Sequence, residues 1–381
     1  MKKQNNKIFH EKIIPLRDNI DKIDSQILSL LARRHDQVLK VVNLKKEHNI
    51  PVYHPAREED LIYRLRTQAK KADLDPDFLE ELYRTILRHS RVKQTDQMEI
   101  NGILPNGRVL IIGGKGQMGS FFASLFIKSG YEVRILGKSD WSMAEQLCQD
   151  IDLALISVPI EQTCDIIEKL SPYLPLNAVL ADLTSIKLKP VNKMLACHKG
   201  PVTGLHPLFG PDPGSLDKQI IVTTPGRDSK ACQWVINQLS VWGGVIVSSS
   251  AQEHDKIMEI VQVLRHFATF CFGQFLFDQR TKIERTLEFS SPIYRLELGM
   301  VGRLFAQDAS LYSEIIFASK SRRTLLNKYV SSLKTHIEML EKNDKKLFVK
   351  KFNTISEWFG PFSEQALQES TFLIDRLIER F

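Results

Sequence analysis

Apolar residues recur at a helical spacing along the first part of the chain. They occupy positions 16, 20, 23, 27, 30, 38 and 41, the three-and-four spacing that places side chains on one face of a helix. Pro15 suits a first helical position, and Asn49-Ile50-Pro51 ends the pattern. One long helix over 15–49 is therefore predicted. Two more follow, from Ala56 to Lys71 and from Asp75-Pro76 to about Lys93.

The pattern changes after a polar stretch without periodicity, which predicts a linker over 96–107. Short apolar runs then alternate with helical segments. We expect seven strands, at 108–113, 132–136, 152–157, 178–182, 201–205, 219–223 and 244–248. This alternation predicts an α/β, doubly wound domain of the Rossmann type over 108–250.

Strand signals stop after Ala251. Residues 251–381 are mostly helix-forming, with breaks near Ser290-Ser291-Pro292 and Gly360-Pro361. The chain is therefore predicted to be multidomain. An all-α N-terminal module over 1–95 precedes the linker and the Rossmann-type domain, and an all-α domain over 251–381 completes it.

Composition narrows the functional classes. The 381 residues are 43% hydrophobic and 25% charged, as in ordinary globular proteins, and the net charge of +7 includes no Lys/Arg block with interleaved aromatics. Nucleic acid is therefore not an expected partner. The 5 cysteines form no C-x-x-C pair, which is typical of reduced thiols, and no metal site is assigned. With no apolar leader and no apolar run judged long enough for a bilayer, we expect a cytoplasmic protein without a membrane partner.

Two cations interrupt the apolar face of the first helix. At about 100° per residue, Arg34 and Lys45 differ by only about 20° around the axis. An unpaired buried charge is costly. One interpretation is that these side chains reach solvent or pair with an acid such as Glu58. The other is a desolvated anion pocket.

Further polar residues accompany these cations. Arg17 points about 100° away from the apolar face, so it is available to a neighbouring subunit. Arg57-Glu58 begins the second helix, and Ser90 and Gln94 are one turn apart on the third.

Residues 11–95 resemble the all-helical class of chorismate mutases. The resemblance is carried by short motifs: Leu16-Arg17-x-x-Ile20-Asp21-x-x-Asp24, Leu30-Leu31-Ala32-x-Arg34, Lys45 and Arg57-Glu58. It implies a pocket for chorismate, a dicarboxylate with an ether oxygen. Three arginines would hold the carboxylates: Arg34, Arg57 and, from the partner chain, Arg17. Four other side chains would complete the site, with Lys45 and Gln94 at the ether oxygen and Glu58 and Ser90 elsewhere on the substrate. A Claisen rearrangement needs a compact conformer and positive charge at the breaking C–O bond, and no nucleophile.

The first predicted strand runs into a G-x-G-x-x-G sequence, Gly114-Lys115-Gly116-Gln117-Met118-Gly119. Between a strand and a helix, this spacing favours a dinucleotide site, because the glycines allow close approach of a pyrophosphate. The alternative is a glycine-rich turn of another α/β fold. We assign Gly114, Gly116, Gln117, Met118 and Gly119 to cofactor binding.

The second strand does not end at the acid that NAD-binding domains usually carry. Gly137-Lys138-Ser139-Asp140 follows it, about 20 residues past the glycine motif. Asp140 is assigned to the ribose of NAD, whereas Lys138 would favour the phosphate of NADP. We expect NAD and leave NADP as the alternative. Ser157-Val158-Pro159, after the third strand, is also assigned to the cofactor.

Candidate catalytic residues follow the later strands. His206 opens the loop Gly204-Leu-His-Pro-Leu-Phe-Gly-Pro211 and is the best candidate; the alternative is a loop histidine that caps backbone. His266, in isolation, is more typical of a structural histidine. Arg295 and Arg303 lie on nearly one face of a helical segment, where either would clamp a carboxylate or form a structural ion pair.

Residues 108–375 resemble the prephenate dehydrogenases. The motifs are Gly-Gly-Lys-Gly-Gln-Met-Gly, Ser-Val-Pro-Ile, Gly-Leu-His-Pro-Leu-Phe-Gly-Pro, Leu-Arg-His-Phe-Ala-Thr-Phe and Ser-Ser-Pro-Ile-Tyr-Arg-Leu-Glu-Leu. The resemblance implies that His206 is the base and that Arg303 binds a substrate carboxylate, with Ser185 and His266 in support. It also implies a homodimer formed largely by the C-terminal helices, and tyrosine as a feedback inhibitor.

Together the two resemblances imply a bifunctional enzyme of tyrosine biosynthesis, which makes prephenate from chorismate and oxidises it to 4-hydroxyphenylpyruvate. Two other hypotheses remain at this point. One is a dehydrogenase of another small acid with a purely structural helical arm, and the other is a non-enzymatic scaffold. The cations Arg34 and Lys45 argue against the first, and the motif around His206 against the second.

Overall fold

A computed structural model describes residues 2–48, 55–97, 102–210 and 214–378. The chain divides into two compact units. Unit 1 comprises residues 1–158, 163–184 and 189–249, and unit 2 comprises 159–162, 185–188 and 250–381. Each unit is described by itself.

The chain begins with three helices, α1 (Lys2–His48), α2 (Pro55–Lys71) and α3 (Pro76–Gln97). We call them the mutase helices after the resemblance described above. Asp75 caps α3 by accepting a hydrogen bond from the backbone N–H of Asp77 at 2.9 Å. The predicted helix start at Pro15 was wrong, because α1 already runs from Lys2 and carries Pro15 inside it. A proline removes one backbone hydrogen bond, and this long helix continues through that loss.

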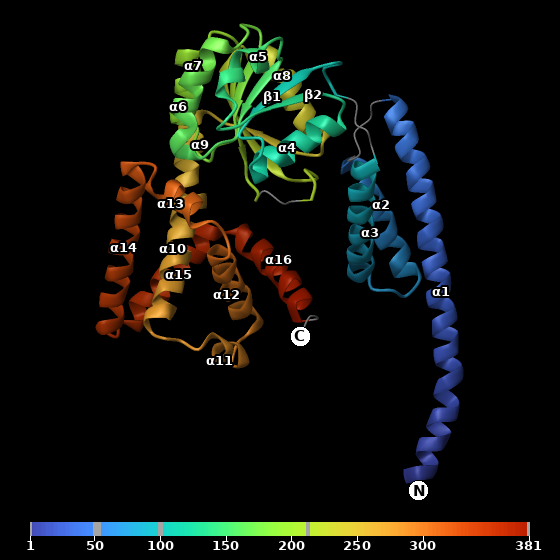
Figure 1. The fold of residues 1–381 in the computed structure, drawn as a ribbon. Helices are drawn as coiled ribbons and strands as arrows, with labels where there is room; N and C mark the ends of the chain where they lie inside the picture. The colour runs from blue at the N-terminus through green and yellow to red at the C-terminus, as the bar shows by residue number, and fades with distance from the viewer. Residues whose placement is uncertain (1, 49–54, 98–101, 211–213, 379–381) are drawn as a thin grey trace. The chain divides into compact units, whose positions relative to one another are not determined.

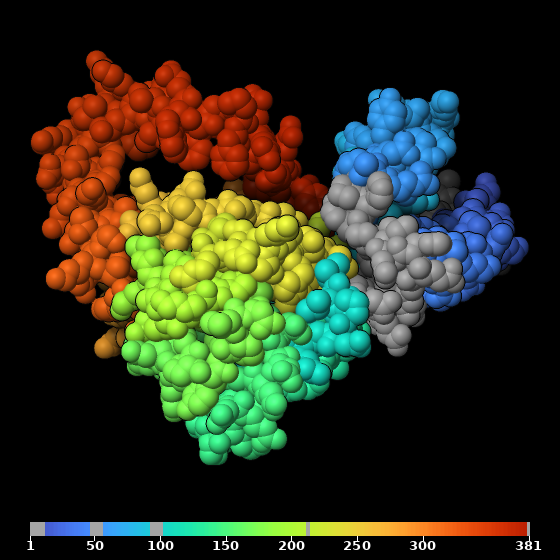
Figure 2. Space-filling view, turned by 90° about the horizontal axis from the view of Figure 1, so that it is seen from above, coloured from blue at the N-terminus to red at the C-terminus, as the bar shows by residue number. Residues whose placement is uncertain are grey.

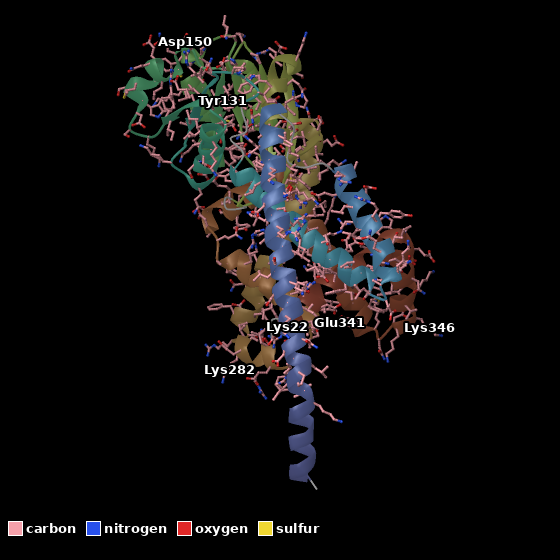
Figure 3. The ribbon with its side chains drawn as sticks, turned by 90° about the vertical axis from the view of Figure 1, so that its right-hand side faces the viewer. Lys22, Tyr131, Asp150, Lys282, Glu341 and Lys346 are labelled. Atoms are coloured by element: carbon pink, nitrogen blue, oxygen red, sulfur yellow. The ribbon has the colours of Figure 1, made fainter. Side chains whose placement is uncertain are left out.

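One end of α1 extends well beyond α2 and α3 (Figure 1), and Lys22 lies on this extended part (Figure 3). The apolar residues predicted to be buried there are 49–58% exposed in the single chain: Leu16, Ile20, Ile23, Ile27 and Leu30. Farther along the helix, Val42 is buried and Arg34 and Lys45 are half-buried, although the predicted Val41 is still 46% exposed. The predicted apolar face therefore exists, and a single chain covers only one end of it.

All seven predicted strands are confirmed, and they form one sheet. They are β1 (Arg108–Ile112), β2 (Glu132–Leu136), β3 (Leu153–Ile156), β4 (Val179–Asp182), β5 (Val202–Pro207), β6 (Ile220–Arg227) and β7 (Val245–Ser248). Their order is β2-β1-β3-β4-β5-β6-β7. All neighbouring pairs are parallel except β5 with β6, whose antiparallel pairing the sequence analysis did not predict.

Helices connect most of the strands (Figure 1). They are α4 (Gln117–Lys128), the 3₁₀ turn η1 (Trp141–Met143), α5 (Ala144–Cys148), α6 (Ile160–Leu170), the 3₁₀ turn η2 (Ser171–Tyr173), α7 (Leu188–Cys197) and α8 (Ser229–Val241). The central strands β1, β3 and β4 are buried along nearly their whole length, as parallel strands covered on both faces must be. This arrangement fixes the carboxyl ends of the strands, where the predicted cofactor motifs lie.

Part of the predicted linker is attached to the sheet. The Tyr131 hydroxyl donates a hydrogen bond to Gln238 Oε1 at 2.7 Å, and the backbone N–H of Ile103 donates to the same oxygen at 2.8 Å. Tyr131 is labelled in Figure 3. Added Cβ atoms on Gly102 and Gly107 would lie 2.5 and 2.8 Å from its ring. Residues 102–107 are thus held against the sheet, and the helix before them continues to Gln97.

Unit 2 is helical from residue 251 onward. Its elements are α9 (Ala251–Met258), a π-helical segment η3 (Glu259–Leu264), α10 (Arg265–Asp278), α11 (Ile283–Glu288), α12 (Pro292–Phe305), α13 (Ala309–Phe317), α14 (Lys320–Glu341), α15 (Lys345–Phe359) and α16 (Pro361–Ile378). Both predicted breaks are confirmed, the second at Gly360, whose φ is +52°. Seen from above, α14 to α16, in orange and red, form an arm that curves around a hollow (Figure 2).

The stretch Ala251–Asp278 has the length and apolar composition of a membrane-crossing helix. The sequence-based statement that no run reaches that length was therefore wrong. Length and composition alone do not make a span, and this stretch carries Arg265 and the buried His266 near its middle. Only 11% of its most apolar window is buried inside the chain, so it presents apolar surface outward.

Candidate active sites

Four predicted residues of the mutase helices interact in two pairs. Arg34 of α1 donates a hydrogen bond from Nη1 to Ser90 Oγ of α3 at 2.8 Å. Lys45 lies farther along α1, close enough to Glu58 of α2 for their charges to interact. Burial lowers the pKa of Lys45, and the Glu58 carboxylate offsets part of that shift. The two cations on the apolar face of α1, Arg34 and Lys45, therefore have polar partners on α3 and α2, as a pocket for an anion requires.

Glu58 has a second cationic partner that the sequence analysis missed. Arg91 Nη1 lies 2.6 Å from both carboxylate oxygens of Glu58, and Arg91 Nε lies 2.8 Å from Asp217 Oδ2. Arg91 directly follows Ser90, and its near-complete burial was not visible in the sequence pattern. The three charges form one ion-pair group, which we call the Arg91 triad.

Three predicted mutase residues are not part of this arrangement. Arg57 is exposed and forms an ion pair with Asp60 at 3.1 Å, one turn along α2. Arg17 is exposed on the extended part of α1. At about 1.5 Å per residue, it is about 25 Å from Arg34 along the helix. Gln94 is on α3, but its side chain lies outside the described part of the structure.

The glycine loop has the geometry that its sequence predicts. An added Cβ on Gly119 would lie 2.5 Å from the Gly113 carbonyl oxygen, and one on Gly116 would lie 3.3 Å from it. Gly116 is the N-cap of α4, and Gln117 and Met118 begin that helix. Gly114 is buried against Ile135. The loop therefore presents backbone at a helix N-terminus, which suits a pyrophosphate.

The sequence analysis missed Gly113, one residue before the motif. Its φ is +80°, and an added Cβ would lie 2.2 Å from the carbonyl oxygen of Ser157. The Ser157 backbone also donates to the Ile112 carbonyl at 2.8 Å. Ser157 and Val158 thus lie beside the glycine loop, while Pro159 begins the short piece that belongs to unit 2. A glycine immediately after a buried strand was the signal for this position.

Asp140 lies near the end of β2 and faces the glycine loop. Its Oδ2 accepts a hydrogen bond from the Gly137 backbone at 2.9 Å and is 3.8 Å from Lys115 Nζ. The Ser139 hydroxyl, followed by the Gly137 N–H, lowers the pKa of Asp140. A carboxylate is therefore fixed beside the loop although the strand itself ends without one.

The dehydrogenase candidates are divided between the two units. His206 is buried in unit 1 and belongs to β5 itself, opposite Val222 of β6, whereas we expected it just after the strand. Ser185 is a half-buried residue of unit 2. Among the described residues, no group of three or more His, Cys, Asp or Glu side chains is arranged to hold a metal ion.

The remaining candidates lie on helices of unit 2. His266 is buried against the Tyr312 ring, with ring centroids 4.7 Å apart. Burial and, to a lesser extent, Arg265 lower the pKa of His266 to about 4, so it is neutral at neutral pH. Arg295 donates to the Leu287 carbonyl at 2.7 Å, a structural contact, whereas Arg303 is exposed. Of the two arginines, Arg303 is the better placed to meet a ligand.

Comparisons with known proteins agree with this division. Three family models match: chorismate mutase type II over residues 16–95, the nucleotide-binding domain of prephenate dehydrogenase over 133–248, and its dimerization domain over 250–354. The T-protein of Enterobacter agglomerans is 43% identical over 95% of this chain and 97% of its own length. That of Haemophilus influenzae is 39% identical over 97% and 98%.

A solved structure supports the fold. The prephenate dehydrogenase from A. aeolicus, in complex with hydroxyphenyl propionate and NAD+, covers 66% of this chain and 97% of its own, with a TM-score of 0.55 and 21% identity. Fold and sites thus define an enzyme that joins an all-helical chorismate mutase to a Rossmann-type prephenate dehydrogenase. The chain belongs to the T-protein family. It is a bifunctional enzyme of tyrosine biosynthesis, and the hypotheses of a structural arm and of a scaffold are not supported.

Proposed function

We propose that the mutase helices rearrange chorismate to prephenate in the pocket of Arg34, Lys45, Glu58 and Ser90. The observation that carries this proposal is the pairing of Arg34 with the neutral Ser90 hydroxyl, at 2.8 Å, with a half-buried Lys45 farther along the same helix. Among the residues that the structure describes, no carboxylate forms an ion pair with Arg34, so its charge is available to a substrate carboxylate. Lys45 and Gln94 hydrogen-bond the ether oxygen.

Arg34 and its neighbours hold the substrate and stabilise its transition state, and they transfer no proton. They favour the compact conformer in which the new C–C bond forms as the C–O bond breaks. The Lys45 ammonium stabilises the negative charge that develops on the ether oxygen. Arg57 is proposed to exchange its exposed partner Asp60 for a substrate carboxylate.

We propose that a second copy of the chain supplies Arg17. About 25 Å separates Arg17 from Arg34 along one α1 helix, so a chain does not deliver this arginine to its own pocket. The exposed apolar face of α1, from Leu16 to Leu30, supports the same conclusion, because an equivalent helix would cover it. The dimerization-domain match indicates a dimer, and we propose a homodimer.

The second site oxidises prephenate, and NAD is its proposed cofactor. The glycine loop fits a dinucleotide, because a tight turn of this kind needs glycine: an added Cβ would lie 2.2 Å from the Ser157 carbonyl oxygen at Gly113 and 2.5 Å from the Gly113 carbonyl oxygen at Gly119. Gly114, Gly116, Gln117 and Met118 are proposed to contact the pyrophosphate, and Ser157, Val158 and Pro159 to line the cofactor site. Asp140 is proposed to accept from the ribose hydroxyls, which favours NAD over NADP.

His206 is proposed to accept the proton of the prephenate 4-hydroxyl. NAD+ supplies a hydride acceptor when bound. The electron pair of the O–H bond becomes the C=O bond as hydride leaves C4. When the C–C bond to CO2 breaks, its electron pair forms the aromatic ring and returns to the oxygen, which takes back the proton to give the phenol. Arg303 is proposed to bind a substrate carboxylate, with Ser185 and the neutral His266 as further contacts. Arg295 is proposed to support the helix that carries Arg303.

Three further expectations are proposals as well. The domains are proposed as 1–95, 96–107, 108–250 and 251–381. The enzyme is proposed to be cytoplasmic. Tyrosine, which resembles the aromatic product, is proposed as a feedback inhibitor that acts at or beside the dehydrogenase site.

Single substitutions test these roles directly. Lys45→Gln removes the charge at the ether oxygen, and we expect mutase kcat/KM to fall at least about a hundredfold, as for loss of one transition-state donor. Lys40→Gln, an exposed lysine of the same helix, is the matched control. An unchanged mutase rate in Lys45→Gln would contradict the proposed pocket.

A further inference from the structure

The Arg91 triad joins the mutase helices to the dinucleotide-binding domain. Glu58 comes from α2 and Arg91 from α3, while Asp217 belongs to the loop between β5 and β6. The side chains of Arg91, Glu58 and Asp217 are only 7%, 13% and 10% exposed. Both ion pairs are short, at 2.6 and 2.8 Å, so solvent screens them little.

The charge balance makes the triad interdependent. Burial alone would lower the pKa of Arg91, but hydrogen bonds to Asp217 and then Glu58 outweigh it and raise the pKa. Arg91 therefore remains a cation, and each carboxylate offsets part of the free-energy cost of burying its charge. When one partner of a buried ion pair is removed, the other is left with an uncompensated charge.

The Asp217 end of the triad is fixed by the sheet. Leu216, the residue before it, is fully buried in the core of the domain. On its other side, the Lys218 backbone donates to the Gly243 carbonyl at 2.9 Å. A Cβ on Gly243 would lie 3.0 Å from the Asp217 Cα. The carboxylate that holds Arg91 thus has its position set outside the mutase helices.

Glu58 is attracted to two cations, Arg91 and Lys45. The Arg91 hydrogen bonds hold its carboxylate on the α3 side of the pocket. Without Arg91, Glu58 would still be attracted to Lys45. A direct pair between them would draw the ammonium away from the substrate ether oxygen.

We propose that Arg91 is a positioning residue of the mutase site, and that Asp217 of the dinucleotide-binding domain holds it in place. The mutase reaction then depends on a residue of the dehydrogenase half. The loop that carries Asp217 starts directly after β5, the strand that contains His206. The inference rests on the proposed roles of Glu58 and Lys45.

Mutase kinetics with chorismate, measured on the full-length enzyme, test the proposal. We expect Arg91→Met to lower kcat/KM by about ten- to a hundredfold, mainly through kcat, because displaced catalytic groups lose transition-state stabilisation. Arg91→Lys should recover part of this loss. Asp217→Asn should lower kcat/KM about three- to tenfold. Asp165→Asn, an exposed carboxylate of the same domain, is the control for charge.

The double variant distinguishes positioning from general destabilisation. Because Asp217 acts through Arg91, Asp217→Asn should cost less than a further twofold when Arg91 is already Met. Thermal unfolding of every variant checks that the protein is folded. An unchanged kcat/KM in Asp217→Asn, or losses that multiply in the double variant, would overturn the inference. If Lys45→Gln loses activity while Asp217→Asn keeps full activity, the role of Asp217 is overturned and the proposed pocket stands. If Lys45→Gln is unaffected, the proposed pocket itself is overturned.

Discussion

The sheet and the first helix differ in how far one chain completes their cores. Strands β1, β3 and β4 are buried almost throughout, and Val109 to Ile111 have no exposed surface. In α1, by contrast, each side chain of the apolar face from Leu16 to Leu30 is about half exposed. A parallel sheet buries its faces with its own crossover helices, whereas a long helix needs a partner outside its own sequence neighbourhood. On the proposed assignments, the glycine loop of the cofactor site comes from one copy of the chain, whereas the mutase site needs a residue from a second copy.

The largest expected effect comes from the exposed apolar face of α1, which one chain leaves uncovered. Placing charges on the apolar stripe, as Ile20→Glu together with Ile27→Glu, should prevent a second α1 from covering it. Mutase kcat/KM should fall by at least about a hundredfold because the pocket loses its partner arginine. The same assay on Ile127→Glu, an exposed isoleucine of α4, serves as control. A folded double variant with full mutase activity would show that the stripe has no such role.

A pair of glycines tests the close packing of the dinucleotide-binding domain. Gly113 and Gly130 have nearly the same φ, +80° and +81°, but only Gly113 has neighbours where a Cβ would go. Gly130→Ala should cost about 1 kcal/mol of stability from backbone strain alone. Gly113→Ala should cost about 2 kcal/mol more and abolish NAD binding, because the loop must move away from Ser157. Thermal unfolding and NAD titration measure both, and equal effects would contradict the close approach at Gly113.

Unit 2 allows a test by pH, because its buried His266 is neutral. Its pKa of about 4 lies below the ordinary value of 6.5, so the unfolded chain binds the proton more readily. The free energy of unfolding therefore falls as pH drops from about 6.5 to 4, by up to about 3 kcal/mol. Between pH 4.5 and 7, His266→Gln should lose stability less steeply than the parent protein. His89→Gln, at an exposed histidine of α3, should keep the parent slope, and equal slopes in all three proteins would contradict the assignment.

The smallest effect concerns the charge of Lys45. Since burial lowers its pKa below 10.5, the mutase should lose activity on the alkaline side before an ordinary lysine titrates. Lys45→Arg keeps its charge at any accessible pH, so its remaining activity should persist to higher pH. The pH dependence of kcat measures this. Identical alkaline limbs in the two proteins would mean that Lys45 does not control the reaction.

Much of the fold was predictable because its signals are local. Strands β1, β3, β4 and β7 consist mostly of Val, Ile, Leu or Ala, and Gly116 and Gly119 stand at fixed spacing after the first of them. The loop around His206 was equally visible, although the strand extends through it. Pairing with β6 prolongs β5 to Pro207, and that pairing is not local.

Side-chain partners across long sequence separations could not be predicted. Arg91 is 33 residues from Glu58 and 126 from Asp217, and no periodicity records such contacts. Periodicity also identified the apolar face of α1 without showing whether the same chain covers it. The sequence thus located most candidate residues, while the Arg91 triad and the exposed stripe required the tertiary structure.

One measurement tests the central claim that this chain carries two separable sites. Purified enzyme is given chorismate and NAD+, and chorismate loss and NADH formation are followed together for the parent protein, His206→Asn and Lys45→Ala. We predict that His206→Asn still consumes chorismate without forming NADH. Lys45→Ala should form NADH only when prephenate is supplied. Loss of both reactions from either substitution, in a protein that remains folded, would contradict two sites and indicate one.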